Sequence, residues 1–194
     1  MVASSLVLAT RNPHKLREFE RLLEPAGIAL EPLPDSVELP PEDGSTFAEN
    51  ALGKARAAAV AMDRPAIADD SGIEARALGG APGVRSARYA GPGASDQENL
   101  DRLLREAPPG SALTYVCVLA YVDPTGPTEQ TFSGRCEGRL AERPRGTGGF
   151  GYDPAFLPQE VADGRTMAEL SEAEKDAISH RGRAARALIA WLAQ

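Results

Sequence analysis

The 194-residue sequence has few cysteines, no long apolar run and no excess of positive charge, and each shortage excludes a class of protein. Its two cysteines, Cys117 and Cys136, are too few and too far apart for a disulfide framework or a Cys-x-x-Cys zinc site. No run of about 18 apolar residues occurs, so we expect no membrane span. Met1 leads straight into the apolar residues 6–8, so we expect no signal peptide. These absences together predict a protein of the reducing cytoplasm.

Positive charge is in the minority, because 21 Lys and Arg residues stand against 28 Asp and Glu residues, which gives a net charge of −7. A protein that coats nucleic acid normally presents a basic face, so a nucleic-acid polymer is not the expected partner. A small anion is still an acceptable ligand, since it needs only a local group of donors. The length and the 42% of hydrophobic residues suit a globular protein. We therefore expect a single domain over residues 1–194.

Apolar runs typical of strands alternate with helical patterns, which favours an α/β fold. Strands are expected at residues 6–9, 66–68, 113–122 and 129–133, the last two forming a hairpin. Helices are expected at residues 13–23 and 46–62, after Ser95, and through the C-terminal part from Ser171. The segment 31–44 contains four prolines and is expected to be a loop or an irregular edge. Cys117 lies inside an apolar run and is expected to be a buried residue rather than a reactive thiol.

The segment from Thr10 to Lys15 joins the first expected strand to the first expected helix. An N-cap at Asn12 would aim free backbone N–H groups and the positive end of the helix at an anion. Arg11 and Lys15 add positive charge, and Thr10 adds a hydroxyl. A Walker loop of the pattern G-x-x-x-x-G-K-[ST] is absent. An ordinary capped turn is the alternative interpretation.

Acidic residues form two further candidate sites. Asp69 and Asp70 follow the strand at residues 66–68, where adjacent carboxylates repel each other unless a cation or hydrogen bonds compensate. Such oxygen ligands suit Mg²⁺, and the alternation of side chains predicts that one Asp faces the ligand while the other supports it. Glu42 precedes a helix that presents Asn50 and Lys54 on one face, a set suited to a metal and a phosphate. A surface turn and a solvated loop acid are the respective alternatives.

Two candidate sites lie in the last third of the chain. The glycines of residues 148–154 allow close approach of the backbone to a ligand, with Phe150 or Tyr152 placed to stack on a base and Asp153 to accept from its edge. Lys175 precedes His180 and Arg181, whose donors suit a keto oxygen on a base. Basic residues near a helix end are the alternative interpretation of this second group.

Taken together and in order, these segments resemble the inosine triphosphate pyrophosphatase family, the XTP/dITP diphosphatases that remove deaminated purine nucleotides. The resemblance extends over nearly the whole chain. Its pieces are residues 9–15 (ATRNPHK), 42–55 (with TFAENA at 46–51), 66–72 (AIADDSG), 78–83 (LGGAPG), 86–89 (SARY), 146–154 (GTGGFGYDP) and 179–182 (SHRG). Each piece is modest alone, and their joint order is specific.

The resemblance implies a two-lobed α/β domain with a long central mixed sheet flanked by helices, a nucleotide in the cleft between the lobes, and a homodimer. It implies a hydrolase that cuts the α–β phosphoanhydride bond of ITP, dITP and XTP with Mg²⁺, releasing a monophosphate and pyrophosphate. Such an enzyme cleanses the nucleotide pool.

The resemblance also assigns roles. Asp70 is the expected general base and a metal ligand, and Glu42 is the expected second metal ligand. The substrate-binding residues that the resemblance implies are Thr10, Asn12, Lys15, Ser71, Phe150, Gly151, Tyr152, Asp153, Lys175, His180 and Arg181, and the residues themselves add Arg11 and Lys54 through their charge. Arg11 departs from the family pattern, which has glycine there.

Three other functions stay open on the sequence. A P-loop-like NTPase or kinase would release the γ-phosphate, and the missing Walker loop counts against it. A nucleotide sensor would bind without cutting, and the grouped acids at positions 42, 69 and 70 count against it. The related Maf-type pyrophosphatases act on other bases, and the pair His180–Arg181 favours the purine-cleaning group over them.

Overall fold

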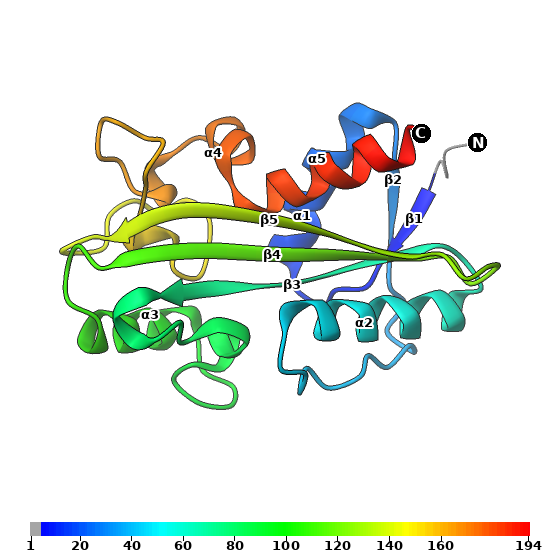
Figure 1. Ribbon diagram of the computed structural model, residues 1–194, viewed down its shortest axis with the longest axis horizontal. Coiled ribbons are helices and arrows are strands. Elements are labelled where there is room, and N and C mark those ends of the chain that lie inside the picture. Colours follow the sequence, from blue (N-terminus) through cyan, green and yellow to red (C-terminus); the bar gives the residue numbers. More distant parts are fainter. Residues whose placement is uncertain (1–4) are drawn as a thin grey trace. The chain divides into compact units, whose positions relative to one another are not determined.

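The computed structural model describes residues 5–194 and contains a six-stranded sheet in the order β2-β1-β3-β4-β5-β6 (Figure 1). The strands are β1 (Ser5–Leu8), β2 (Ala29–Pro32), β3 (Ala66–Ala75), β4 (Ala112–Val122), β5 (Glu129–Leu140) and β6 (Phe156–Pro158). β1 runs parallel to β2 and β3, whereas β5 and β6 are antiparallel, so the sheet is mixed. The predicted α/β class with a mixed central sheet is confirmed.

Five α-helices flank the strands. They are α1 (Pro13–Leu23), α2 (Phe47–Met62), α3 (Asp96–Glu106), α4 (Glu172–Ile178) and α5 (His180–Leu192). Short 3-10 helices lie at η1 (Glu24–Ala26), η2 (Arg76–Leu78), η3 (Gly83–Arg88), η4 (Asp153–Ala155) and η5 (Met167–Glu169).

The chain divides into two compact units. Unit 1 is drawn from Met1–Asp70, Cys117–Gly134 and Arg181–Gln194, and it is described from Ser5 onward. Unit 2 consists of Ser71–Val116 and Arg135–His180. The prediction of a single domain over residues 1–194 includes residues 1–4, which lie outside the described residues, and it stays a prediction.

In unit 1, helices cover both faces of the strands. Because side chains alternate along each strand, successive residues are buried against different helices. Leu6 and Leu8 of β1 pack with α1 and α5 on one face, where Phe19 and Leu188 are buried. Val7 packs on the opposite face with the alanines of α2 (Figure 1). Small side chains on α2 let its backbone approach the sheet closely, and this helix carries Asn50 and Lys54.

Unit 2 has its own core. Leu100 and Leu103 of α3 are buried together with Ile73 of β3 and Phe156 of β6. Tyr115 of β4 belongs to the same core as Tyr152, a residue of the predicted binding segment 148–154.

The predicted helix starts are confirmed in detail. Capping boxes begin α2, α3 and α4 at Thr46, Ser95 and Ser171, each with a glutamate three residues later that accepts from the cap backbone. Asn12 caps α1, and Pro13 occupies its first turn.

Four strands differ from the prediction by more than one residue: β2 and β6 were not predicted, and β3 and β5 are longer than predicted. β2 was not predicted, since its residues 31 and 32 were assigned to the proline-rich loop; Pro32 is tolerated because it is the last residue of a strand at the sheet edge. β3 continues through Asp69–Gly72 to Ala75, so the two acids lie inside a strand rather than in a turn after it. β5 continues to Leu140, seven residues beyond its predicted end at residue 133.

Two further expectations concern apolar character. Cys117 is fully buried, as predicted, and burial raises the pKa of its thiol to about 12, with the charge of Asp69 adding to the effect. Among the described residues, no helix is long and apolar enough to cross a membrane. The prediction that a signal peptide is absent falls partly on residues 1–4, outside the described part of the chain.

Candidate functional site

The loop between β1 and α1 carries three predicted substrate-binding residues, Lys15 follows in the first turn of α1, and side chains of the loop fix its shape. Asn12 Oδ1 accepts the backbone N–H groups of His14 at 2.8 Å and Lys15 at 3.2 Å. Thr10 Oγ1 accepts the N–H of Asn12 at 3.2 Å. The predicted cap is therefore present: Asn12 engages two of the first backbone N–H groups of α1, and Thr10 engages the N–H of Asn12.

Arg11 extends away from this loop toward the proline-rich segment. Its guanidinium donates to the carbonyl oxygens of Leu33 at 2.7 Å, Pro34 at 2.8 Å and Val37 at 2.6 Å. Asp35 lies 3.4 Å from the same group. In this structure Arg11 holds the segment that leads to Glu42, and its predicted contact with substrate stays a prediction.

Asp69 lies in a network of buried charges that we call the Asp69 network: Asp69, Lys15, Arg181 and Glu18. Asp69 Oδ2 is 3.0 Å from Lys15 Nζ of α1 and 3.5 Å from Arg181 Nη2 of α5. Arg181 also donates to Glu18 of α1, and its side chain is only 2% exposed. Two cations and two carboxylates therefore balance within the core between β3 and two helices of unit 1.

The surroundings of Asp69 favour its ionised form. Burial alone would raise its pKa, but the charges of Lys15, Arg181 and Lys54 outweigh burial and hold the pKa well below its ordinary value. Burial alone would lower the pKa of Arg181, but the negative charges of Asp69 and Glu18 outweigh burial and raise it. Asp69 is thus a permanent anion that neutralises buried cations.

Asp70 points to the other face of β3, as the predicted alternation requires, and lies in what we call the Asp70 network: Asp70, Asn50, Gly44, Glu42 and Lys54. Asn50 Nδ2 of α2 donates to Asp70 Oδ2 at 2.8 Å. Lys54, one turn later on α2, donates to Glu42 and to the backbone oxygen of Asp69 at 2.6 Å.

The surroundings of Asp70 disfavour its ionised form. Burial is the largest cause of its raised pKa, and the negative charge of Glu42 raises the pKa further, against the hydrogen bond from Asn50 and the charge of Lys54. The pKa of Lys54 is raised although burial opposes this, because the charges of Asp69 and Glu42 prevail. Asp70 is thus a carboxylate under electrostatic strain that a cation would relieve.

A divalent metal fits this pair of carboxylates. Glu42 and Asp70 are close enough for the charge of one to raise the pKa of the other, and both offer hard oxygen ligands. Within residues 5–194, no group of three or more His, Cys, Asp or Glu side chains is arranged to hold a metal ion. A site on Glu42 and Asp70 thus has two protein carboxylates, and Mg²⁺ typically adds water and substrate phosphate to such a pair.

In unit 2, Asp153 joins two predicted binding segments. Its Oδ2 accepts from Lys175 Nζ at 2.6 Å and from the N–H of Phe150 at 2.9 Å, and its Oδ1 accepts from Tyr115 at 3.0 Å. A Cβ on Gly149 would meet that Oδ2 at 2.0 Å, so the glycine-rich loop is closed tightly around this carboxylate. Asp153 therefore holds Lys175 and the loop in position. Its predicted contact with the edge of a base stays a prediction.

The remaining predicted residues of unit 2 divide between buried and partly exposed places. Tyr152 is buried, its hydroxyl donates to Ser86 O at 2.8 Å, and burial raises its pKa. His180 is also buried and stacks on Tyr115 with ring centroids 4.5 Å apart and planes 5° apart. Ser71, Phe150 and Gly151 are partly exposed. The Nζ of Lys175 lies 5.2 Å from the ring centroid of Phe150.

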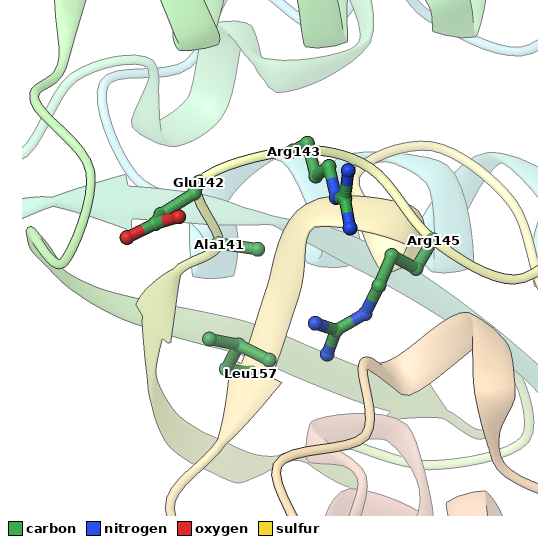
Figure 2. Close-up of a pocket in the computed structure, with 5 residues that line it drawn as sticks. All are labelled: Ala141, Glu142, Arg143, Arg145 and Leu157. Carbon is green, nitrogen blue, oxygen red and sulfur yellow. The ribbon is translucent and has the colours of Figure 1, made fainter.

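A hollow of about 460 Å³ in unit 2 has none of the predicted residues in its lining. It is lined by Ala141, Glu142, Arg143, Arg145 and Leu157 (Figure 2). Arg145 is already paired with Glu169 at 3.2 Å. None of the lining residues belongs to a segment singled out in the sequence, so this hollow adds nothing to the candidate site.

Glu18 and Tyr115 contact predicted site residues although neither was singled out in the sequence, whereas Asn50 was singled out but without its contact to Asp70. Glu18 balances Arg181, Asn50 binds Asp70, and Tyr115 binds Asp153 and stacks on His180. Asn50 was visible through its spacing from Lys54 on one helix face. Glu18 and Tyr115 carried no signal in the sequence, because their partners are more than 35 positions away along the chain.

Comparison with known proteins finds close relatives over nearly the full length. The model of the Ham1 family matches residues 6–191. A dITP/XTP pyrophosphatase of Symbiobacterium thermophilum is 54% identical over 189 residues, covering 95% of this chain and 92% of the relative. The dITP/XTP pyrophosphatase of Geobacillus kaustophilus is 49% identical, covering 92% and 89%. A solved HAM1 protein from Coxiella burnetii is 42% identical with a TM-score of 0.86, covering 97% and 98%.

Proposed function

Because this chain belongs to the Ham1 family, we propose that it hydrolyses the deaminated purine nucleotides ITP, dITP and XTP, with Mg²⁺, to a monophosphate and pyrophosphate. The names of its dITP/XTP pyrophosphatase relatives support the substrate class. One structural observation carries the proposal: β3 presents two adjacent carboxylates to different partners, Asp69 to Lys15 and Arg181, and Asp70 to Asn50 of α2, the helix whose Lys54 binds Glu42.

Asp70 is the proposed general base. A base that accepts a proton from water works best when its pKa lies near the working pH, and both burial and Glu42 move the pKa of Asp70 in that direction. Asn50 holds one oxygen of this carboxylate at 2.8 Å, which fixes the orientation of the group toward a reacting water. Bound to Glu42 and Asp70, Mg²⁺ would supply charge neutralisation at the phosphate oxygens.

Positive and polar groups near the start of α1 and on α2 are the proposed phosphate ligands. Thr10, Asn12 and Lys15 precede or begin α1, whose N-terminal dipole favours anions. Lys54, with its raised pKa, keeps a full positive charge to stabilise the departing pyrophosphate. Further proposed contacts with the nucleotide are those of Arg11, Ser71, Phe150, Gly151, Tyr152, Asp153 and Lys175.

Selection of the base is proposed to rest on hydrogen-bond polarity. His180 and Arg181 would donate to the 6-keto oxygen of hypoxanthine or xanthine, whereas the 6-amino group of adenine would leave buried donors unpaired. The ratio of kcat/KM for ITP to that for ATP tests this. We expect the ratio to decrease at least tenfold in Arg181→Lys, and an unchanged ratio in this variant contradicts the assignment of Arg181.

The homodimer and the cytoplasmic location also stay proposals. Light scattering after size-exclusion chromatography tests the first: a mass of twice 20.4 kDa supports a dimer, and 20.4 kDa contradicts it.

Product analysis tests the function itself. The purified protein is incubated with Mg²⁺ and with ITP, XTP, GTP or ATP in separate reactions, and the products are resolved by chromatography. We expect monophosphate and pyrophosphate, with ITP and XTP far ahead of GTP and ATP, and no reaction in excess EDTA. Diphosphate products would indicate a γ-phosphatase, and binding without turnover would indicate a sensor.

A further inference from the structure

Asn50 is a buried residue whose side-chain amide uses both of its polar atoms in hydrogen bonds. Its Nδ2 donates to Asp70 Oδ2 at 2.8 Å, and its Oδ1 accepts the backbone N–H of Gly44 at 2.8 Å. The side chain is anchored on α2, a helix of 16 residues packed against the sheet. One rigid group therefore links the proposed base on β3 to the loop that carries Glu42.

Gly44 permits this link by having no side chain. A Cβ at this position would lie 2.6 Å from Asn50 Oδ1 and 2.9 Å from the Cβ of Glu49. Real side-chain carbons do not approach so closely, so any other residue would push the loop away from Asn50 or turn the amide away from Asp70. The backbone of Gly44 does not adopt a positive φ, so close approach rather than backbone conformation explains the glycine.

Lys54 supports the same loop from the next turn of α2. It donates to Glu42, two residues before Gly44, and shares a helix face with Asn50 because the two are four residues apart. Asn50 and Lys54 thus each attach the loop to α2, in addition to the contacts of Ser45 with Glu49. Either attachment lost alone would let the distance between Glu42 and Asp70 vary.

We propose that Asn50, with Gly44, is a positioning element that sets the spacing of Glu42 and Asp70 and so organises the divalent-cation site before the cation binds. This inference rests on the proposed function, since it takes Glu42 and Asp70 as the metal ligands. Groups that orient metal ligands in this way commonly contribute 10–100-fold to metal affinity or activity.

The direct test is Mn²⁺ binding to the nucleotide-free protein, followed by electron paramagnetic resonance. Asn50→Ala removes both hydrogen bonds, and Gly44→Ala disturbs the same contact without removing a polar atom. We expect the Kd for Mn²⁺ to rise about tenfold or more in each variant. We also expect turnover with ITP to show a lower kcat and a higher half-saturating Mg²⁺ concentration, with little change in KM for ITP.

Two matched controls separate positioning from stability. Asn99→Ala removes a buried amide that also makes two hydrogen bonds, to Ala90 N and Ala87 O, in unit 2. Gly53→Ala adds a Cβ on α2 that would lie 3.8 Å from Pro40 Cγ, an ordinary contact. Both controls should bind Mn²⁺ within twofold of wild type. Thermal unfolding verifies that each protein is folded.

The outcomes are distinguishable. If wild type binds Mn²⁺ and hydrolyses ITP while folded Asn50→Ala and Gly44→Ala bind Mn²⁺ as tightly as wild type, the positioning role is overturned and the proposed function stands. If Asn99→Ala weakens binding as much as Asn50→Ala, the effect is one of general stability and the positioning role is likewise overturned. If wild type itself binds no Mn²⁺ at millimolar concentrations, the metal site and this inference are both overturned.

Discussion

Asp69 and Asp70 are neighbours in the chain and differ in almost everything else. Asp69 faces α1 and α5, where Lys15 and Arg181 lower its pKa. Asp70 faces α2, where burial and the charge of Glu42 raise its pKa although Asn50 donates to it. The pleat of β3 sends identical side chains to opposite faces, and the partners on each face decide whether the carboxylate stabilises the fold or is held ready for chemistry.

The difference teaches where electrostatic strain accumulates in this protein. The Asp69 network balances two cations with two carboxylates, so its charges stabilise one another. The Asp70 network brings Glu42 and Asp70 together with one lysine, so its negative charge is in excess. An excess of this kind reduces stability and suits a site that recruits a cation.

The largest effect should come from Asp70→Asn. The variant keeps the shape of the side chain and removes the base, so we expect turnover of ITP to decrease about 10²–10⁴-fold. Pyrophosphate release under saturating ITP and Mg²⁺ measures it. The control Asp163→Asn changes an exposed aspartate paired with Arg165 and should keep full turnover. Turnover of Asp70→Asn within threefold of wild type would remove Asp70 from the role of base.

The next effect should come from Asp69→Asn, and it should appear as stability. Loss of this anion leaves Lys15 and Arg181 undercompensated in the core, which typically costs about 3–5 kcal/mol. Because the pKa of Asp69 is lowered in the fold, its contribution is present above about pH 4 and is lost as the pH falls through the folded-state pKa. Urea unfolding should therefore show that the difference in free energy of unfolding between wild type and Asp69→Asn becomes smaller from pH 7 to pH 3. A constant difference would contradict the ionic role.

Lys54→Met should affect both regions, because Lys54 binds Glu42 and the backbone of Asp69. We expect the free energy of unfolding to decrease by about 1–3 kcal/mol, because two acceptors lose a charged donor. We also expect turnover to decrease. Urea unfolding and ITP hydrolysis measure the two losses. A variant that loses stability but keeps turnover would confine Lys54 to a structural role.

The smallest effect should come from Arg11→Gly, which restores the residue of the family pattern. It removes three hydrogen bonds to carbonyls of the proline-rich segment from a half-exposed side chain, so we expect a loss of about 1–2 kcal/mol. That corresponds to a decrease in Tm of about 2–8 °C for a chain of this size. Unchanged Tm with a large rise in KM for ITP would instead favour direct binding of substrate by Arg11.

Local signals in the sequence predicted much of this fold. Thr46 and Ser95 with their glutamates marked two helix starts, and Asn12 with Pro13 marked another. The second half of β5 was missed although buried and exposed residues alternate along it, because Gly134 and Gly138 interrupt the apolar pattern. The second half of β3 was missed because the residues directly after position 68 are polar. Their side-chain partners lie on helices that are distant in the sequence.

The candidate site shows the same limit. The types and spacing of Asp70 and Lys54 indicated chemistry from the sequence alone. The contact of Tyr115 with Asp153 spans 38 positions and that of Glu18 with Arg181 spans 163, so no local pattern could predict them. Which of the two adjacent aspartates has the raised pKa depends on its surroundings: burial prevails at Asp70, with the charge of Glu42 adding to it, whereas Lys15 and Arg181 outweigh burial at Asp69, and only the fold reveals this.

Thermal unfolding of Asp69→Asn and Asp70→Asn beside wild type, at pH 7 in EDTA, tests this contrast most directly. The raised folded-state pKa of Asp70 means that its ionisation at neutral pH disfavours the fold, whereas the lowered pKa of Asp69 means the opposite. We therefore expect Asp70→Asn to unfold at a higher temperature than wild type and Asp69→Asn at a lower one. A decrease in Tm in both variants would contradict the division of β3 into a stabilising carboxylate and a strained one.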